Sequence, residues 1–172
     1  MSLAIVYTRA ALGIEAPLIT VEVHLSNGLP GLTMVGLPET TVKEARDRVR
    51  SALINSGYAF PAKKITINLA PADLPKEGGR YDLPIALALL VASEQLNTTR
   101  LNQYEFVGEL ALTGGLRGVP GAIPSAMEAI KAGRRIVVSS DNAAEVGLIG
   151  GSDCLVADHL QEVCAFLAGQ TS

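Results

Sequence analysis

The sequence predicts an α/β protein in which helices pack on a mixed β-sheet that begins with antiparallel strands. Two patterns predict this class: short alternating, β-branched runs near the N-terminus, and an alternation of strand-like and helix-like segments in the second half. The chain of 172 residues is 48% hydrophobic but only 4% aromatic, so its core is expected to be aliphatic. This length suits a single domain over residues 1–172.

Two stretches near the N-terminus predict the antiparallel strands. Residues 3–8 form a short apolar run, and residues 18–25 alternate between apolar and polar side chains. A Ser-Asn-Gly turn signal at 26–28 separates the second stretch from an apolar run at 31–37. We therefore expect residues 18–37 to form an antiparallel β-hairpin.

A helix is expected after Pro38. Thr41 and Glu44 have the spacing of a capping box, and apolar residues recur at helical spacing after them. Three cations fall within about 60° of one another on a 3.6-residue helix and form what we call the basic stripe: Lys43, Arg46 and Arg50. The stripe is either a solvated face with ion pairs or a contact face for nucleic acid, another acidic partner or a neighbouring subunit.

The chain is organised around residues 68–84, NLAPADLPKEGGRYDLP, which we call the central loop. This loop lies between a predicted strand at 63–69 and the most apolar run, 83–92, which is expected to be a buried helix. A glycine-rich loop that enters a helix N-terminus with two basic side chains suits an anion. Lys76 and Arg80 are therefore candidate anion contacts, and the alternative is a connection with a solvated rim.

The second half alternates strands and helices, which implies parallel pairing with helices on a sheet face. The strands are expected at 106–112, 135–139 and 154–157, and the helices at 124–132, at 142–149 and after a capping Asp158.

Composition and motifs exclude several classes of function. The net charge of −3 argues against a broadly basic nucleic-acid surface, although a local patch remains compatible with it. No signal peptide or stretch long enough to span a bilayer is found, and Cys154 and Cys164 are typical of buried thiols in a reducing cytoplasm. No metal-site spacing occurs, and without a Gly-Lys dipeptide no Walker A loop can form. The chain is therefore not expected to hydrolyse nucleotides by itself.

Three ordered stretches carry a family resemblance: residues 35–53, 65–90 and 106–126. Together they resemble the N-terminal domain of the bacterial magnesium-chelatase-like AAA+ ATPases of the ComM/YifB group. The resemblance implies that the chain is a fragment, with an AAA+ module expected after residue 172 and with ATP and Mg²⁺ bound there rather than in this chain. It also implies a hexameric ring, contacts with the AAA+ module and with neighbouring subunits, and DNA as a partner in competence-linked branch migration.

The same domain resembles the proteolytic domain of Lon, whose α/β fold also occurs in a ribosomal protein. Against the Lon motifs, the position of the nucleophilic serine holds Arg80, and the position of the lysine holds Ile123. A Ser-Lys dyad needs a hydroxyl and an amine that deprotonates it, and neither side chain supplies these groups. The resemblance therefore implies a protease-like scaffold without peptidase chemistry.

Three hypotheses follow for the function. The first is a non-catalytic accessory domain of an AAA+ motor that assists ring assembly and holds DNA through Lys76 and Arg80 and through the basic stripe. The second is an oligomerisation module that makes subunit contacts without binding DNA. The third is a residual hydrolase with a different nucleophile: Ser125, Ser139 or Ser140.

Overall fold

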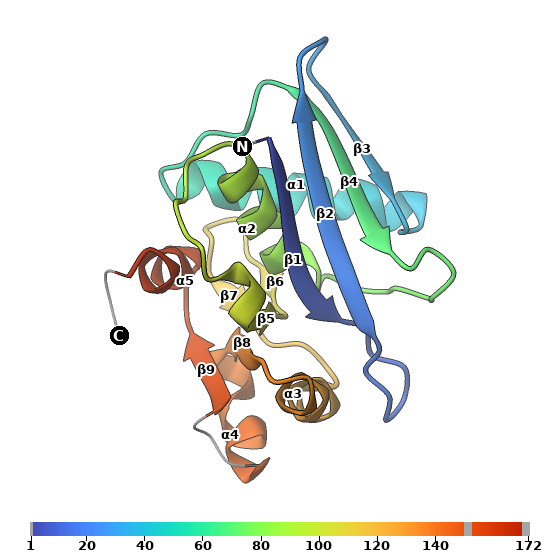
Figure 1. Ribbon diagram of the computed structural model, residues 1–172, viewed down its shortest axis with the longest axis vertical. Coiled ribbons are helices and arrows are strands. Elements are labelled where there is room, and N and C mark those ends of the chain that lie inside the picture. The colour runs from blue at the N-terminus through green and yellow to red at the C-terminus, as the bar shows by residue number, and fades with distance from the viewer. Residues whose placement is uncertain (1, 150–152, 170–172) are drawn as a thin grey trace.

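The computed structural model describes residues 2–149 and 153–169, which form a seven-stranded mixed sheet with helices packed on it (Figure 1). The strand order in this sheet is β3-β4-β2-β1-β5-β8-β9, and a separate two-stranded ribbon is formed by β6 and β7. The strands are β1 (Leu3–Arg9), β2 (Leu18–Ser26), β3 (Gly31–Val35), β4 (Lys64–Ala70), β5 (Tyr104–Phe106), β6 (Glu109–Leu110), β7 (Leu116–Arg117), β8 (Arg135–Ser139) and β9 (Cys154–Ala157). The α-helices are α1 (Glu39–Asn55), α2 (Asp82–Ala92), α3 (Ala122–Lys131), α4 (Ala143–Val146) and α5 (Leu160–Leu167), and single 3-10 turns occur at Leu101–Gln103, Ser140–Asn142 and Gly147–Ile149.

The N-terminal part of the sheet is antiparallel, but the predicted hairpin over residues 18–37 is wrong. β2 pairs antiparallel with β1 and with β4, while β3 pairs parallel to the far side of β4. The antiparallel hairpin is therefore formed by β1 and β2. β4 takes the interior position because its inward side chains, Ile65, Ile67 and Leu69, are fully buried, which leaves the short β3 as an edge strand.

The C-terminal part of the sheet is parallel, as the alternation of strands and helices predicted. β5 pairs parallel with β1 and β8, and β8 pairs parallel with β9. Both faces of β8 are buried, with Ile136 and Val138 in the cluster that includes α3 and with Val137 in the cluster that includes α5. The predicted strand at 106–112 is interrupted, because Gly108 leaves the sheet and exchanges backbone hydrogen bonds with Arg80 and Leu83.

Most helices begin and end close to the predicted residues, although the helix expected at 142–149 is α-helical only over Ala143–Val146, between two 3-10 turns. Two further corrections concern the N-termini of α1 and α5. α1 begins at Glu39 after an extended Pro38, and no side chain forms the predicted cap from Thr41. His159 rather than Asp158 caps α5, since its Nδ1 accepts a hydrogen bond from the Gln161 backbone N–H. α2 is buried on nearly all sides, as its uniform apolarity predicted. Within the described ranges, no helix combines the length and the apolar character that crossing a membrane requires.

Candidate functional site

Lys76, one of the two cations predicted to contact an anion, is folded back onto the central loop. Its Nζ donates hydrogen bonds to the carbonyl oxygens of Pro71 and Leu74, at 2.5 and 3.1 Å. Only 2% of the residue is exposed, and burial lowers the pKa of its ammonium group, partly offset by the nearby Asp73. The amine therefore closes the loop, and a contact with phosphate would require these hydrogen bonds to break.

Arg80, the second predicted cation, belongs to the central loop, and its side chain is buried. Its Nε donates to the carbonyl oxygen of Arg9 at 2.9 Å, its Nη1 to that of Pro120 at 2.5 Å, and its Nη2 to Ser125 Oγ at 2.9 Å. Burial lowers the pKa of this guanidinium. The side chain thus ties the central loop to the end of β1 and to α3, together with the Pro120 segment just before that helix.

A hollow of about 500 Å³ lies above Arg80, between the β1–β2 connection, the central loop and the segment that precedes α3. The other charged residues that line it are acidic, Glu77 and Glu109. A Cβ added at Gly79 would lie 2.7 Å from Glu109 Cγ, so a larger residue there would require the Glu109 side chain to shift. A hollow with two carboxylates and with a guanidinium bound to carbonyl groups is a poor site for an anion. The prediction that Lys76 and Arg80 contact DNA is not tested by these contacts and stays a prediction.

α2 is held at its first residue by an ion pair with α1. Arg48 Nε and Nη2 donate to the two carboxylate oxygens of Asp82 at 2.7 and 3.2 Å, and the Leu110 backbone N–H also donates to Asp82 Oδ2. Burial raises the pKa of Asp82 to about 6, although the hydrogen bonds from Arg48 and Leu110 act in the opposite direction. The same pair raises the pKa of Arg48. Desolvation of the Asp82 carboxylate therefore costs more free energy than its hydrogen bonds with Arg48 and Leu110 contribute.

The basic stripe of α1 is exposed, as predicted. Arg46 Nε lies 3.8 Å from Asp47 Oδ1, and Arg50 packs over the Phe60 ring at 5.8 Å. Three acidic residues share the exposed part of this helix: Glu39, Glu44 and Asp47. The helix surface is consequently of mixed sign rather than strongly basic.

Two buried ion clusters were not found by reasoning from the sequence. Arg48 could have been found, since it precedes Val49 of the buried stripe and follows the buried Ala45 by three residues. Glu105 is fully buried in β5 and pairs with Arg9 at 2.6 Å and Arg134 at 3.0 Å. The signal there is an acidic residue inside an apolar strand, because a buried charge requires a partner.

The residues considered for hydrolase chemistry take part in structural hydrogen bonds. Ser125 is fully buried and accepts from Arg80, and Ser139 Oγ donates to the Leu116 carbonyl at 3.0 Å. Ser140 Oγ donates to an Asp158 carboxylate oxygen. Ile123 lies in the first turn of α3, the helix that Arg80 contacts through Ser125.

ATP and Mg²⁺, which the family resemblance implies for the parent protein, do not fit the groups described here. A triphosphate site of the Walker A type needs free backbone N–H groups and a free lysine, whereas Lys76 and Arg80 are bound to carbonyl oxygens. Among residues 2–149 and 153–169, no three His, Cys, Asp or Glu side chains lie close enough together to hold a metal ion. No nucleotide chemistry is therefore assigned to these residues.

Comparison with known proteins gives consistent matches over this chain. A family described as "Subunit ChlI of Mg-chelatase" matches residues 21–142. The uncharacterized protein YifB of Escherichia coli strain K12 is 79% identical over 170 residues, which cover 99% of this chain and 34% of YifB. The competence protein ComM of Haemophilus influenzae is 60% identical over 170 residues, with 99% of this chain and 33% of ComM covered. An uncharacterized protein of Mycobacterium tuberculosis strain H37Rv is 36% identical over 172 residues. The chain thus spans about a third of the length of these relatives.

Proposed function

This chain belongs to the magnesium-chelatase subunit ChlI family together with YifB and ComM, and from this we propose that it is a non-catalytic accessory domain of an AAA+ protein. In this proposal the exposed surface of the domain, rather than its central loop, contacts neighbouring subunits and DNA. The Lon-type fold of the domain is part of the same proposal.

The observation that carries the proposal is the environment of Arg80. This residue occupies the position that resembles the Lon nucleophile, and all three of its contacts are with carbonyl or hydroxyl oxygens of the protein itself. A guanidinium is neither a nucleophile nor a base at neutral pH. Its three hydrogen bonds hold the guanidinium on oxygen atoms of the protein itself, which supports a structural role for this side chain.

DNA engagement is assigned to the basic stripe, because Lys43, Arg46 and Arg50 are the predicted contact cations that are exposed. Exposed lysine and arginine side chains bind phosphates and release counterions, which makes binding depend on salt. This assignment is tested with Lys43→Ala/Arg46→Ala, and Arg50 is retained because it also packs on Phe60. The double variant should bind a short DNA duplex more weakly, with a salt slope of log K against log salt that is smaller by about 2.

A matched control removes the same charge elsewhere. Arg117 and Lys131 are exposed cations outside α1, so Arg117→Ala/Lys131→Ala should leave the salt slope close to that of the unmodified chain. Fluorescence anisotropy titrations at several salt concentrations measure both variants. Equal slopes for the two double variants would remove DNA engagement from the role of the stripe.

A subunit-contact module without DNA binding is the second candidate, and the mixed charge of α1 favours it. Three exposed acidic residues alternate with the three cations, which suits a complementary protein surface better than a uniformly negative phosphate backbone. If the domain only makes subunit contacts, neither double variant changes DNA binding. The contacts between copies then lie on surface features of the domain that substitutions can test.

A further inference from the structure

The turn between β2 and β3 presents an exposed apolar side chain with cations beside it. Leu29 is 90% exposed at the tip of this turn. Lys63 reaches the same turn, since its Nζ donates to Asn27 Oδ1 at 3.0 Å, and Lys64 pairs with both Ser26 and Gly31 in the sheet register. Neither the turn, residues 26–31, nor the segment 61–64 contains a carboxylate side chain. We call this feature the basic knob: Leu29, Lys63 and Lys64.

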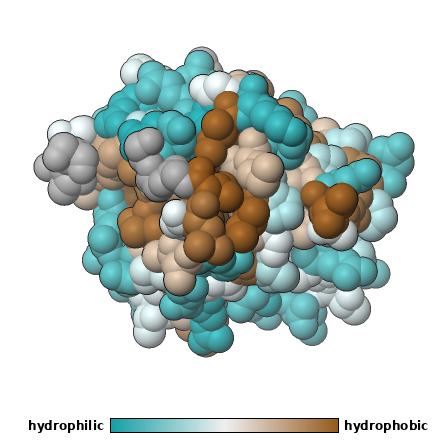
Figure 2. All heavy atoms as spheres, turned by 90° about the horizontal axis from the view of Figure 1, so that it is seen from below, coloured by the Kyte–Doolittle hydropathy of each residue, from teal (hydrophilic) through white to brown (hydrophobic). Residues whose placement is uncertain are grey.

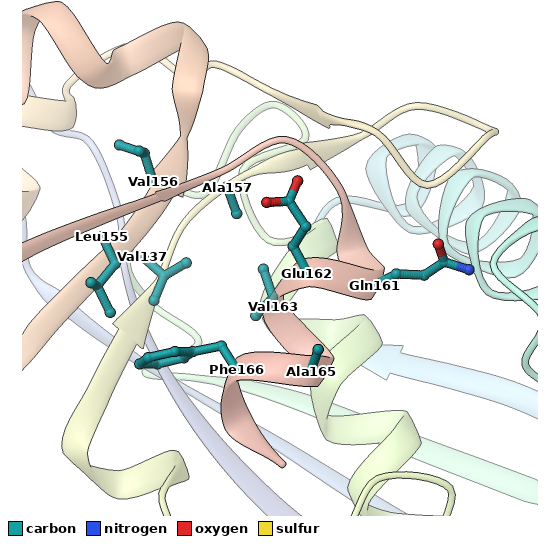
Figure 3. A pocket seen from close by; sticks show the side chains of 9 residues that line it. All are labelled: Val137, Leu155, Val156, Ala157, Gln161, Glu162, Val163, Ala165 and Phe166. Atoms are coloured by element: carbon teal, nitrogen blue, oxygen red, sulfur yellow. The ribbon is translucent and has the colours of Figure 1, made fainter. Parts of the chain in front are cut away.

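An apolar hollow of about 510 Å³ lies at the opposite edge of the sheet, between β9, β8 and α5. Figure 3 shows Val137, Leu155, Val163 and Phe166 pointing toward one another in this hollow. It is found near the end of the molecule that carries α3, α4 and β9, where Figure 2 shows apolar side chains gathered on the surface. We call this feature the socket.

The charged side chain that lines the socket is an acid, Glu162, and the exposed Asp158 lies between the lining residues Ala157 and Gln161. Two cations lie near the socket. Arg135 precedes the lining residue Val137 by two residues in β8, and Arg100 is engaged within the domain. Its Nη1 donates to the Phe166 carbonyl and its Nη2 to Tyr104 Oη, both at 2.8 Å. The socket is thus apolar with an acidic side near the start of α5.

We propose that the basic knob of one copy of this chain inserts into the socket of a neighbouring copy. The hollow is large enough to take the Leu29 side chain, and Lys63 and Lys64 would then face Glu162 and Asp158. An apolar side chain that enters a hollow with complementary charge around it combines burial with orientation. This inference rests on the proposed function, since it names the surfaces through which the domain contacts its neighbours.

The position of the two features makes the contact head-to-tail. β3 and β9 are the two edges of the sheet, and Figure 1 shows the β2–β3 turn and β9 toward opposite ends of the long axis. A contact between two different surfaces of identical chains leaves one knob and one socket free in each dimer. Such a contact continues to further copies and forms a ring when the rotation closes.

Leu29→Asp tests the knob, and Ile14→Asp is its matched control because Ile14 is 92% exposed in a different loop. Sedimentation velocity over a range of concentrations should show self-association of the unmodified chain that Leu29→Asp weakens by at least about tenfold. Ile14→Asp should associate like the unmodified chain. Leu155→Asp, on the socket side, should weaken association to a similar extent, and the Leu29 variant carries the test if the half-buried Leu155 variant does not fold.

Charge reversal tests the pairing of the two features directly. Lys64→Glu and Glu162→Lys should each weaken association, and both substitutions in one chain should restore it. Association that is unchanged in Leu29→Asp, or equally lost in Ile14→Asp, overturns this contact while the proposed function stands. A chain that remains monomeric at every concentration overturns both this contact and the subunit-contact part of the proposed function.

Discussion

The central loop and α1 both carry basic side chains that predict contacts with an acidic partner, but the fold buries those of the central loop and exposes those of α1. Lys76 and Arg80 are 2% and 4% exposed, and their donors are bound to oxygen atoms of the protein. Lys43 and Arg46 of α1 are exposed and lie among acidic neighbours. The comparison shows that basic side chains near glycines can donate to carbonyl oxygens of their own loop, so their position in the sequence does not by itself predict an exposed cation.

Arg80→Ala should produce the largest loss of stability among the basic residues compared here. The substitution removes three hydrogen bonds and leaves the Arg9 and Pro120 carbonyls and the Ser125 hydroxyl in need of partners. We expect the free energy of unfolding to fall by about 3 kcal/mol or more, measured by urea denaturation.

Arg80→Lys separates the charge of this side chain from its geometry. Lysine retains the positive charge but lacks the planar fork that reaches three acceptors, so we expect an intermediate loss. If Arg80→Lys unfolded at the same urea concentration as the unmodified chain, the three-acceptor role of the guanidinium would be wrong.

Asp82 should give a pH-dependent effect of intermediate size, because its buried carboxyl titrates differently in the folded and unfolded states. Its pKa rises from 3.8 to about 6 on folding. A carboxyl with a raised pKa contributes stability that is fully present below about pH 4 and is lost as the pH rises through about 6. The stability of the unmodified chain relative to Asp82→Asn should therefore fall by on the order of 2–3 kcal/mol between pH 3.5 and pH 7.

Denaturation of both chains at each pH measures this difference, and the comparison cancels the titration of the other carboxyl groups. If the stability of the unmodified chain relative to Asp82→Asn increased with pH, the prediction would be contradicted. Such an increase would mean that the ion pair with Arg48 outweighs the burial cost of Asp82.

Lys43→Ala/Arg46→Ala should have the smallest effect on stability. Both side chains are exposed, and the contact of Arg46 with Asp47 spans 3.8 Å on the surface. Substitutions of this kind usually change the free energy of unfolding by less than about 0.5 kcal/mol each. The same denaturation experiment measures it, and a loss as large as that of Arg80→Ala would erase the distinction between the two regions.

Local sequence patterns predicted most helices and strands, because these elements are recognised from the periodicity of apolar side chains. The alternation in residues 18–25 and the uniform apolarity of 83–92 correctly predicted a half-buried strand and a buried helix. Strand neighbours depend on the whole sheet, so the turn at 26–28 could not reveal that β4 inserts between β2 and β3.

The environment of the candidate site was harder to predict than its location. The sequence places Arg80 before a helix N-terminus, and the fold brings Arg9, Pro120 and Ser125 to it from 71, 40 and 45 residues away. A local sequence pattern cannot predict contacts between residues this far apart in the chain. The exposure of Lys43 followed from helical spacing, since it lies on the opposite side of α1 from the buried Ala45 and Ala52.

The central claim is that Arg80 is a structural cation, whereas the exposed cations on α1 are available for binding. Urea denaturation of Arg80→Ala beside Lys43→Ala/Arg46→Ala tests it most directly. The account predicts a loss of about 3 kcal/mol or more for the first variant and a change of less than about 1 kcal/mol for the second. An Arg80→Ala chain that is as stable as the unmodified one would contradict it.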